Sequence, residues 1–115
     1  MSDPTIDRAT FDALKDTTGA EFVVELVAAF VDEAPAMLAE LRRTLAAGDA
    51  EAFRRNAHSL KSNARTFGAP ALAAMARDLE TGGLDRATGA GDAPLDALEA
   101  EYARVAAALK ALCHA

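Results

Sequence analysis

The chain has 115 residues, which is enough for one domain with a sizeable hydrophobic core. Hydrophobic residues make up 51% of it, alanine is abundant, and there is one tyrosine and no tryptophan, so an all-α domain is favoured over a sheet protein. The net charge of −6 argues against general nucleic-acid binding, because contacts to phosphate groups need a basic face.

The N-terminal segment contains one short helical pattern. Residues 1–6 lack the basic and apolar pattern of a secretory signal and are expected to form a flexible lead. Asp7 is a candidate N-cap for a short helix over 8–17, in which Phe11 and Leu14 face inward. The apolar face of this helix is too small for independent stability, so we expect it to pack across an end of something larger.

A long helix is predicted over 20–47, where apolar residues recur at helical spacing. Pro35 lies inside this stretch and predicts a kink rather than a stop, because the apolar stripe keeps its phase across the proline. Gly48 is expected to close the helix, and Asp49 can cap the next one.

The next helix, over 51–67, has two distinct faces. Its buried face is predicted by a 4-3-4-3 spacing of Phe53, Ala57, Leu60, Ala64 and Phe67. A second set also follows helical spacing and consists of Arg54, His58, Ser62 and Arg65. The two sets lie about 140° apart around the helix axis. One of only two histidines in the chain therefore points outward among cations.

Two further helices are expected after a break at Gly68. The first covers 70–81, with Pro70 suited to its first turn. The glycine-rich stretch 81–94 is expected to be a loop. The last helix begins at Asp92 and Pro94 and continues to about Cys113 with an a/d apolar spacing.

Together these patterns predict an all-α domain over residues 1–115. Four amphipathic helices with short connections favour an antiparallel up-down-up-down four-helix bundle, with the short N-terminal helix as an addition. A dimeric, kinase-like helical hairpin is the alternative architecture. Four independent apolar stripes in one chain favour a monomer instead.

Several classes of function are disfavoured by what the chain lacks. An autonomous hydrolase needs a nucleophile, a base and an orienting group, and His114, the other histidine, lies at the end of the last helix. No His-x-x-x-His or Glu-x-x-His pair is available for a metal, and Cys113 is the only cysteine. No apolar run approaches the ~18 residues of a membrane span, so we expect a cytoplasmic protein with no membrane partner.

The outward face around His58 permits phosphoryl chemistry. A neutral imidazole nitrogen is a good phosphoryl acceptor, and a carboxylate on its other nitrogen would fix the tautomer. Glu80 is a candidate for that carboxylate if the helices on either side of Gly68 are antiparallel. Lys61, one turn beyond His58, could reach an anion held on the ring.

Three neighbouring residues would assist such chemistry. Arg54 and Arg65 extend the positive charge along the helix, and the small side chain of Ser62 leaves the ring open to a partner. The alternative interpretation is that His58 is an ordinary surface residue on a solvated, charged face.

The sequence resembles the histidine-containing phosphotransfer (HPt) domain family over nearly its whole length. The resemblance is carried by Ala57-His58-Ser59-Leu60-Lys61-Ser62-Asn63-Ala64, then Phe67-Gly68-Ala69, and then Leu72 and Leu79-Glu80. The shared pattern is an alanine-histidine, a leucine-lysine followed by a small residue, and a glycine that ends the helix ten residues after the histidine.

This resemblance implies roles for individual residues. His58 would carry the phosphoryl group on its exposed nitrogen, Lys61 would stabilise the added charge, and Glu80 would hydrogen-bond the inner nitrogen. Ser62 stands where family members often have glycine; serine preserves access but adds a hydroxyl group. Partners in the family dock on an apolar patch beside the histidine helix, to which Phe11 and Leu14 are candidate contributors.

The resemblance also implies a place in a phosphorelay. A response-regulator receiver domain, with Mg²⁺ bound to it, would pass a phosphoryl group from its aspartyl phosphate to His58, and the reaction would be reversible. A hybrid histidine kinase is a further expected partner. The chain itself would bind no cofactor and would be a carrier rather than an enzyme. Two alternatives are an interaction module that carries no phosphate and a phosphoacceptor domain excised from a chemotaxis-type histidine kinase.

Overall fold

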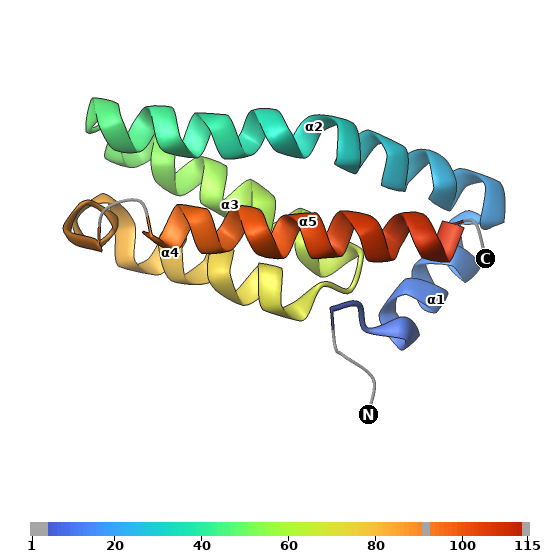
Figure 1. Ribbon diagram of the computed structural model, residues 1–115. Coiled ribbons are helices and arrows are strands. Elements are labelled where there is room, and N and C mark those ends of the chain that lie inside the picture. Colours follow the sequence, from blue (N-terminus) through green and yellow to red (C-terminus); the bar gives the residue numbers. More distant parts are fainter. Residues whose placement is uncertain (1–4, 91–92, 114–115) are drawn as a thin grey trace.

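The structure is a computed structural model that describes residues 5–90 and 93–113, and of residues 84–88 and 90 only the backbone. The described residues form five helices: α1 (Arg8–Thr18), α2 (Ala20–Ala47), α3 (Ala50–Thr66), α4 (Pro70–Ala90) and α5 (Ala93–Cys113) (Figure 1). They include no strand. The predicted all-α class is therefore confirmed.

The four longer helices, α2 to α5, lie side by side, and α1 lies at one end of them (Figure 1). Helix α3 packs against α2 and α4, and α5 packs against the same two helices. Helix α1 contacts α2 and α3. The largest fully buried side chains come from the four long helices and include Phe53, Leu41, Leu60, Leu72, Leu95, Leu98 and Leu109. The helices therefore share one hydrophobic core, which holds α3 rigidly.

Most of the predicted helix ends are confirmed, with one correction at α1. Gly48 follows α2 in the left-handed conformation, and the Asp49 carboxylate accepts a hydrogen bond from the backbone N–H of Ala52 at 3.2 Å. Asp7 precedes α1 as expected, but its carboxylate accepts no backbone hydrogen bond at the cap. It accepts one from the Thr10 hydroxyl instead, at 2.5 Å, and is thereby engaged by a side chain rather than by the helix backbone.

Two segments predicted to be irregular are more ordered than expected. Helix α4 passes through one non-helical residue, Gly83 (φ 70°, ψ −172°), and resumes to Ala90, where a loop was predicted over 81–94. The stretch after Gly83 contains leucine, arginine and alanine, which are good helix formers. Ile6 is buried in the core rather than part of a flexible lead. Residues 1–4 of that lead and Asp92 lie outside the described residues.

Helix α2 continues through Pro35, as predicted, and its first half inclines towards α1 (Figure 1). Proline has no N–H, so the carbonyl of Val31, four residues earlier, has no helical donor. The hydroxyl of Tyr102 on α5 donates a hydrogen bond to this carbonyl at 3.0 Å. Burial raises the pKa of the Tyr102 phenol. A side chain from another helix thus satisfies the acceptor that the proline leaves open.

Replacing Tyr102 with phenylalanine is expected to lower the free energy of unfolding by about 1 kcal/mol, because the Val31 carbonyl loses its donor. A Pro35→Ala background restores the backbone N–H, so the same tyrosine replacement should cost much less there. Urea unfolding of the four proteins of this double-mutant cycle measures the difference. An equal cost in both backgrounds would show that the hydroxyl does not compensate for the proline.

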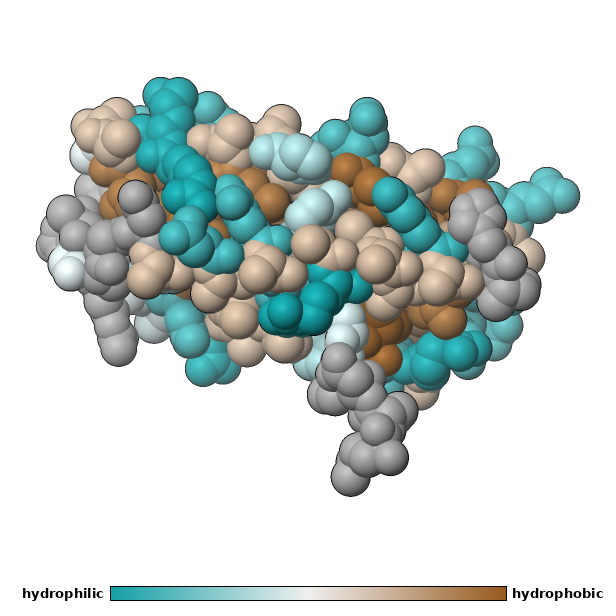
Figure 2. All heavy atoms as spheres, viewed as in Figure 1, coloured by the Kyte–Doolittle hydropathy of each residue, from teal (hydrophilic) through white to brown (hydrophobic). Residues whose placement is uncertain are grey.

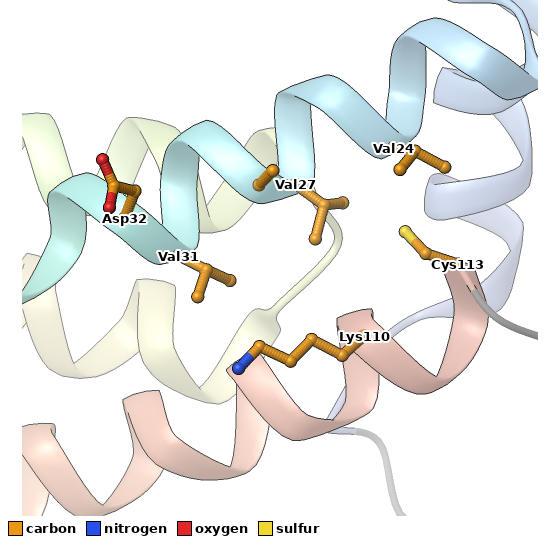
Figure 3. A pocket seen from close by; sticks show the side chains of 7 residues that line it. Val24, Val27, Val31, Asp32, Lys110 and Cys113 are labelled. Carbon is orange, nitrogen blue, oxygen red and sulfur yellow. The ribbon is translucent and has the colours of Figure 1, made fainter.

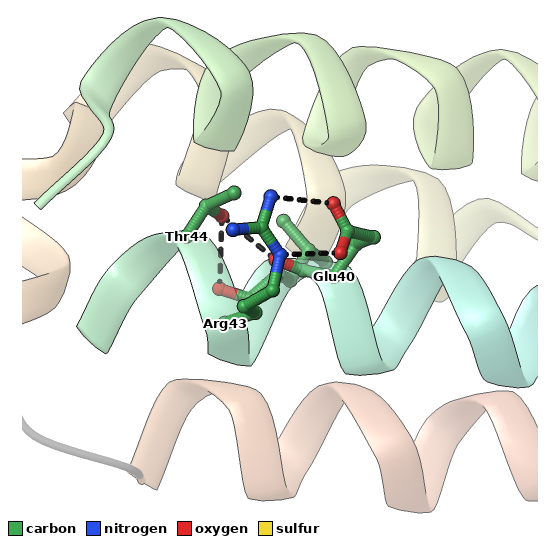
Figure 4. A network of polar contacts seen from close by, with 4 residues as sticks. Glu40, Arg43 and Thr44 are labelled. Atoms are coloured by element: carbon green, nitrogen blue, oxygen red, sulfur yellow. Dashed lines mark hydrogen bonds and ion pairs between the residues drawn. The ribbon is translucent and has the colours of Figure 1, made fainter. Parts of the chain in front are cut away.

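Helix α2 carries an ion pair at its surface and a hydroxyl group in its buried face. Arg43 contacts both carboxylate oxygens of Glu40, at 2.6 and 2.9 Å (Figure 4). The buried Thr44 hydroxyl lies within hydrogen-bonding distance of the backbone carbonyls of Glu40 (2.8 Å) and Leu41 (3.2 Å). These contacts satisfy the polar groups locally, but exposed ion pairs of this kind contribute little stability.

Candidate functional site

Helix α3 presents His58 to solvent from a firmly anchored backbone. Its core-facing side chains are fully buried, as the spacing predicted: Phe53, Ala57, Leu60 and Ala64. Between them the His58 side chain is 56% exposed. Because the helix cannot rotate without exposing its apolar stripe, the imidazole is held at the surface in a fixed direction.

Glu80 on α4 bridges His58 and Lys61. One carboxylate oxygen, Oε2, lies 2.8 Å from His58 Nδ1, and the other, Oε1, lies 2.6 Å from Lys61 Nζ. The chain reverses between α3 and α4 at Gly68, whose φ of 77° is in the left-handed region. The structure thus brings together the three residues that the sequence singled out on either side of this turn.

The contacts around Glu80 determine the protonation state of its carboxyl group. The hydrogen bond from Lys61 and, to a lesser extent, the bond to His58 lower the pKa of the Glu80 carboxyl from its ordinary value of 4.5, although partial burial opposes this. Glu80 is therefore ionised at neutral pH and acts as an acceptor only. Its contribution to stability is present above pH 4.5 and is lost as the pH falls through the lowered pKa.

The ionised carboxylate fixes the tautomer of a neutral His58. With an acceptor 2.8 Å from Nδ1, the ring proton is assigned to that nitrogen. The lone pair is then on Nε2, the nitrogen that does not contact Glu80. Lys61 Nζ reaches this system through Glu80, and the Lys61 side chain is only 13% exposed.

Arg54 lies beside His58, together with two residues that the sequence analysis did not single out. A surface pocket of about 360 Å³ is lined by Arg54, Arg55, His58, Ser59 and Glu80. Arg55 makes an ion pair with Glu51 at 3.4 Å. Its position three residues before His58 was a usable signal, since residues at this spacing share a helix face.

Arg65 and Ser62 are exposed but do not line this pocket. Arg65 lines a separate pocket of about 180 Å³ whose other residues include Asp7 and Gly68, next to the start of α1. It lies two turns from His58 along α3, so the structure does not bring its guanidinium to the imidazole. Ser62 follows His58 by four residues and is exposed, and its role in access to the ring stays a prediction.

The expected docking residues on α1 need correction. Phe11 is only 3% exposed and belongs to the hydrophobic core, so it offers no surface to a partner. Leu14 is half-buried against the same core. The apolar face of α1 is used to attach the helix to α2 and α3. Among the residues whose side chains the structure describes, the large hydrophobic ones that are exposed are Phe22 and Val24, at the start of α2.

A larger pocket of about 440 Å³ lies between α2 and α5 (Figure 3). It is lined by Val24, Val27, Ala28, Val31, Asp32, Lys110 and Cys113. Figure 2 shows apolar side chains at the surface among polar ones on this face of the molecule. None of the lining residues comes from α3 or α4, so this pocket is separate from the His58 site.

The described residues hold neither a group of metal-binding side chains nor a membrane-spanning helix. Among residues 5–90 and 93–113, no three His, Cys, Asp or Glu side chains are grouped so that they could hold a metal ion. In the same part of the chain, no helix combines the length and the apolar character that crossing a membrane requires.

Comparisons with known proteins identify the family of the chain. The sequence matches the family model of the Hpt domain over residues 25–115. The crystal structure of histidine-containing phosphotransfer protein B (HptB) from Pseudomonas aeruginosa PAO1 is similar, with a TM-score of 0.84 and 30% sequence identity over 98% of this chain and 97% of that chain. A comparison with curated proteins found no match. Since the family model covers most of the chain, including the whole of the His58 site, the chain belongs to the Hpt domain family.

Proposed function

We propose that this protein is a histidine phosphotransfer protein of a two-component phosphorelay and that His58 carries the phosphoryl group. The observation that supports this most strongly is the exposed imidazole whose Nδ1 lies 2.8 Å from an ionised carboxylate. Membership of the Hpt domain family supports it independently. In the proposed reaction, His58 accepts a phosphoryl group from a receiver-domain aspartyl phosphate and passes it to another receiver.

The proposed transfer is a single displacement at phosphorus. The Nε2 lone pair of His58 attacks the phosphorus atom, an N–P bond forms, and the P–O bond to the aspartate breaks. The aspartate leaves as a carboxylate with the electron pair. The imidazole gains positive charge, and its Nδ1–H stays hydrogen-bonded to Glu80, whose negative charge stabilises the charged ring. The reverse displacement returns the group to a receiver.

In this proposal Glu80 orients the imidazole and Lys61 supports Glu80. The ammonium group of Lys61 also places positive charge close to the phosphoryl group, although its direct contact is with the carboxylate, at 2.6 Å. Arg65 contributes only through its longer-range charge. Ser62 keeps the approach to the ring open. The contacts of Glu80 with His58 and Lys61 support the first two of these roles.

The chain acts in this proposal as a carrier, and its partner supplies most catalytic groups. No cofactor is bound by this chain; Mg²⁺ on the receiver domain would neutralise charge on the phosphoryl oxygens. The partners are response-regulator receiver domains and a hybrid histidine kinase. We further infer a monomer in which α2 to α5 form an antiparallel up-down-up-down bundle with α1 as an additional helix, an arrangement supported by the single shared core.

Replacing His58 with glutamine is expected to abolish phosphoryl acceptance while the fold is kept, because the side chain is 56% exposed. The measurement is incubation with phosphorylated receiver domains, followed by detection of acid-labile label on this chain. His114→Gln removes the other histidine and is the matched control, which should accept label at the normal rate. Label on the His58 variant would contradict the assignment, and no label on the unmodified protein from any receiver would support a non-phosphorylated interaction module.

A further inference from the structure

The phosphoryl oxygens of a phosphorylated His58 would need cationic partners that Lys61 does not directly supply. A phosphoryl group adds up to two negative charges beside the ring. Lys61 Nζ is engaged by Glu80 Oε1 at 2.6 Å, and the Lys61 side chain is only 13% exposed. Its charge is therefore largely balanced by the carboxylate before any phosphoryl group arrives.

Arg54 and Arg55 lie on the same side of α3 as His58. They are four and three residues before it, spacings that place side chains on one helix face. Both line the pocket of about 360 Å³ that also contains the imidazole. Ser59, beside them in the pocket, is small and leaves room over the ring. Two arginine side chains thus line the same pocket as His58.

Neither guanidinium group is held in a close ion pair. The Arg55–Glu51 ion pair is long, at 3.4 Å, and its two side chains are 64% and 76% exposed. Such an exposed ion pair contributes little to stability, so Arg55 can exchange Glu51 for another anion. Among the described residues, Arg54 has no ion-pair partner. Both side chains can therefore turn to an anion in the pocket.

We propose that Arg54 and Arg55 bind the phosphoryl oxygens during transfer to and from His58, an inference that rests on the proposed function. A guanidinium group presents two parallel N–H donors that match two phosphoryl oxygens, which an ammonium group does not. Arg55 exchanges the carboxylate of Glu51 for the more highly charged phosphoryl group. Lys61 then acts mainly on Glu80, and the two arginines act on the transferred group.

A small phosphoryl donor tests this inference without a protein partner. With potassium phosphoramidate, Nε2 of His58 attacks phosphorus, the N–P bond of the donor breaks, and ammonia leaves with the electron pair. The second-order rate constant for phosphorylation of His58 is measured by ³¹P NMR for Arg54→Gln, Arg55→Gln and the double variant. Arg8→Gln, an exposed arginine on α1 that lies outside the pocket, is the matched control.

Each single replacement is expected to lower the rate constant about threefold and the double replacement about tenfold, and the loss should shrink at high salt. Lysine at both positions should restore only part of the rate, because the charge returns without the paired donors. Glu51→Gln should raise the rate, since it releases Arg55. The Arg8 control should match the unmodified protein.

Two negative results have different meanings. If the unmodified protein becomes phosphorylated on His58 and the double variant reacts at the same rate at low salt, the arginines do not bind the phosphoryl group and the inference is wrong. If the unmodified protein acquires no phosphohistidine from phosphoramidate or from any receiver, the proposed function itself fails. Circular dichroism of each variant confirms that the helices are intact.

Discussion

Replacing Glu80 with alanine is expected to slow phosphoryl acceptance by His58 roughly 10- to 100-fold, by analogy with the loss of a carboxylate that orients a metal-binding histidine. The replacement removes the acceptor that lies 2.8 Å from Nδ1, so the ring can rotate and the proton can move to Nε2. It also removes the counter-charge of Lys61, whose side chain is only 13% exposed. Glu80 therefore affects the reaction through His58 and Lys61 and not through a contact with the phosphoryl group.

A glutamine at the same position separates orientation from charge. Glu80→Gln keeps an acceptor oxygen for Nδ1 but removes the negative charge that stabilises the phosphorylated ring. We expect its rate to lie between those of the alanine variant and the unmodified protein. ¹⁵N NMR of the unphosphorylated His58 reports the tautomer in each variant. A Glu80→Ala variant with unchanged rate and tautomer would rule out the orienting role.

Replacing Gly68 with alanine is expected to lower the free energy of unfolding by about 3 kcal/mol, the largest stability effect that we predict for a single replacement. Gly68 has a φ of 77°, which L-residues rarely adopt. A Cβ atom there would also lie 2.9 Å from the backbone oxygen of Asp7 and 2.9 Å from the Thr10 Cβ. The backbone N–H of Asp7 donates to the Gly68 carbonyl at 2.6 Å, so α1 cannot move away without losing this bond.

Gly48 provides the control for this replacement. Its φ of 74° is nearly the same, but nothing lies within 4 Å of the position that a Cβ would occupy. Gly48→Ala should therefore cost only the backbone strain, about 1 kcal/mol. Urea unfolding of both variants measures the two costs, and their difference isolates the steric clash with α1. Equal losses would mean that α1 does not pack against the turn as described.

The histidine face could be predicted because its signals are local. The alternation of buried and exposed residues along α3 follows from helical periodicity alone, and the glycine at 68 indicates a reversal that carries Glu80 back towards His58. The contact between Lys61 and Glu80 could not be predicted, because a long, flexible side chain can reach several acceptors. Which one it contacts depends on the spacing between α3 and α4.

The other differences between the sequence-based predictions and the structure also arise from tertiary packing. Phe11 has the same apolar character whether it faces a core or a partner, and only the position of α1 across the long helices decides between them. The hydrogen bond from Tyr102 to Val31 joins residues 71 positions apart, so no local pattern indicates it. The helix after Gly83 was not predicted because the glycines around it are typical of a loop. The residues between these glycines nevertheless favour helix.

The most direct test of the account is to identify the nitrogen that carries phosphorus. The protein is phosphorylated by a receiver domain or by phosphoramidate, and ¹⁵N–³¹P couplings of the histidine ring are measured by NMR. Because Nδ1 is held 2.8 Å from Glu80, we expect a single phosphohistidine at His58 with phosphorus on Nε2. Phosphorus on Nδ1 of His58, or on any residue other than His58, would contradict it.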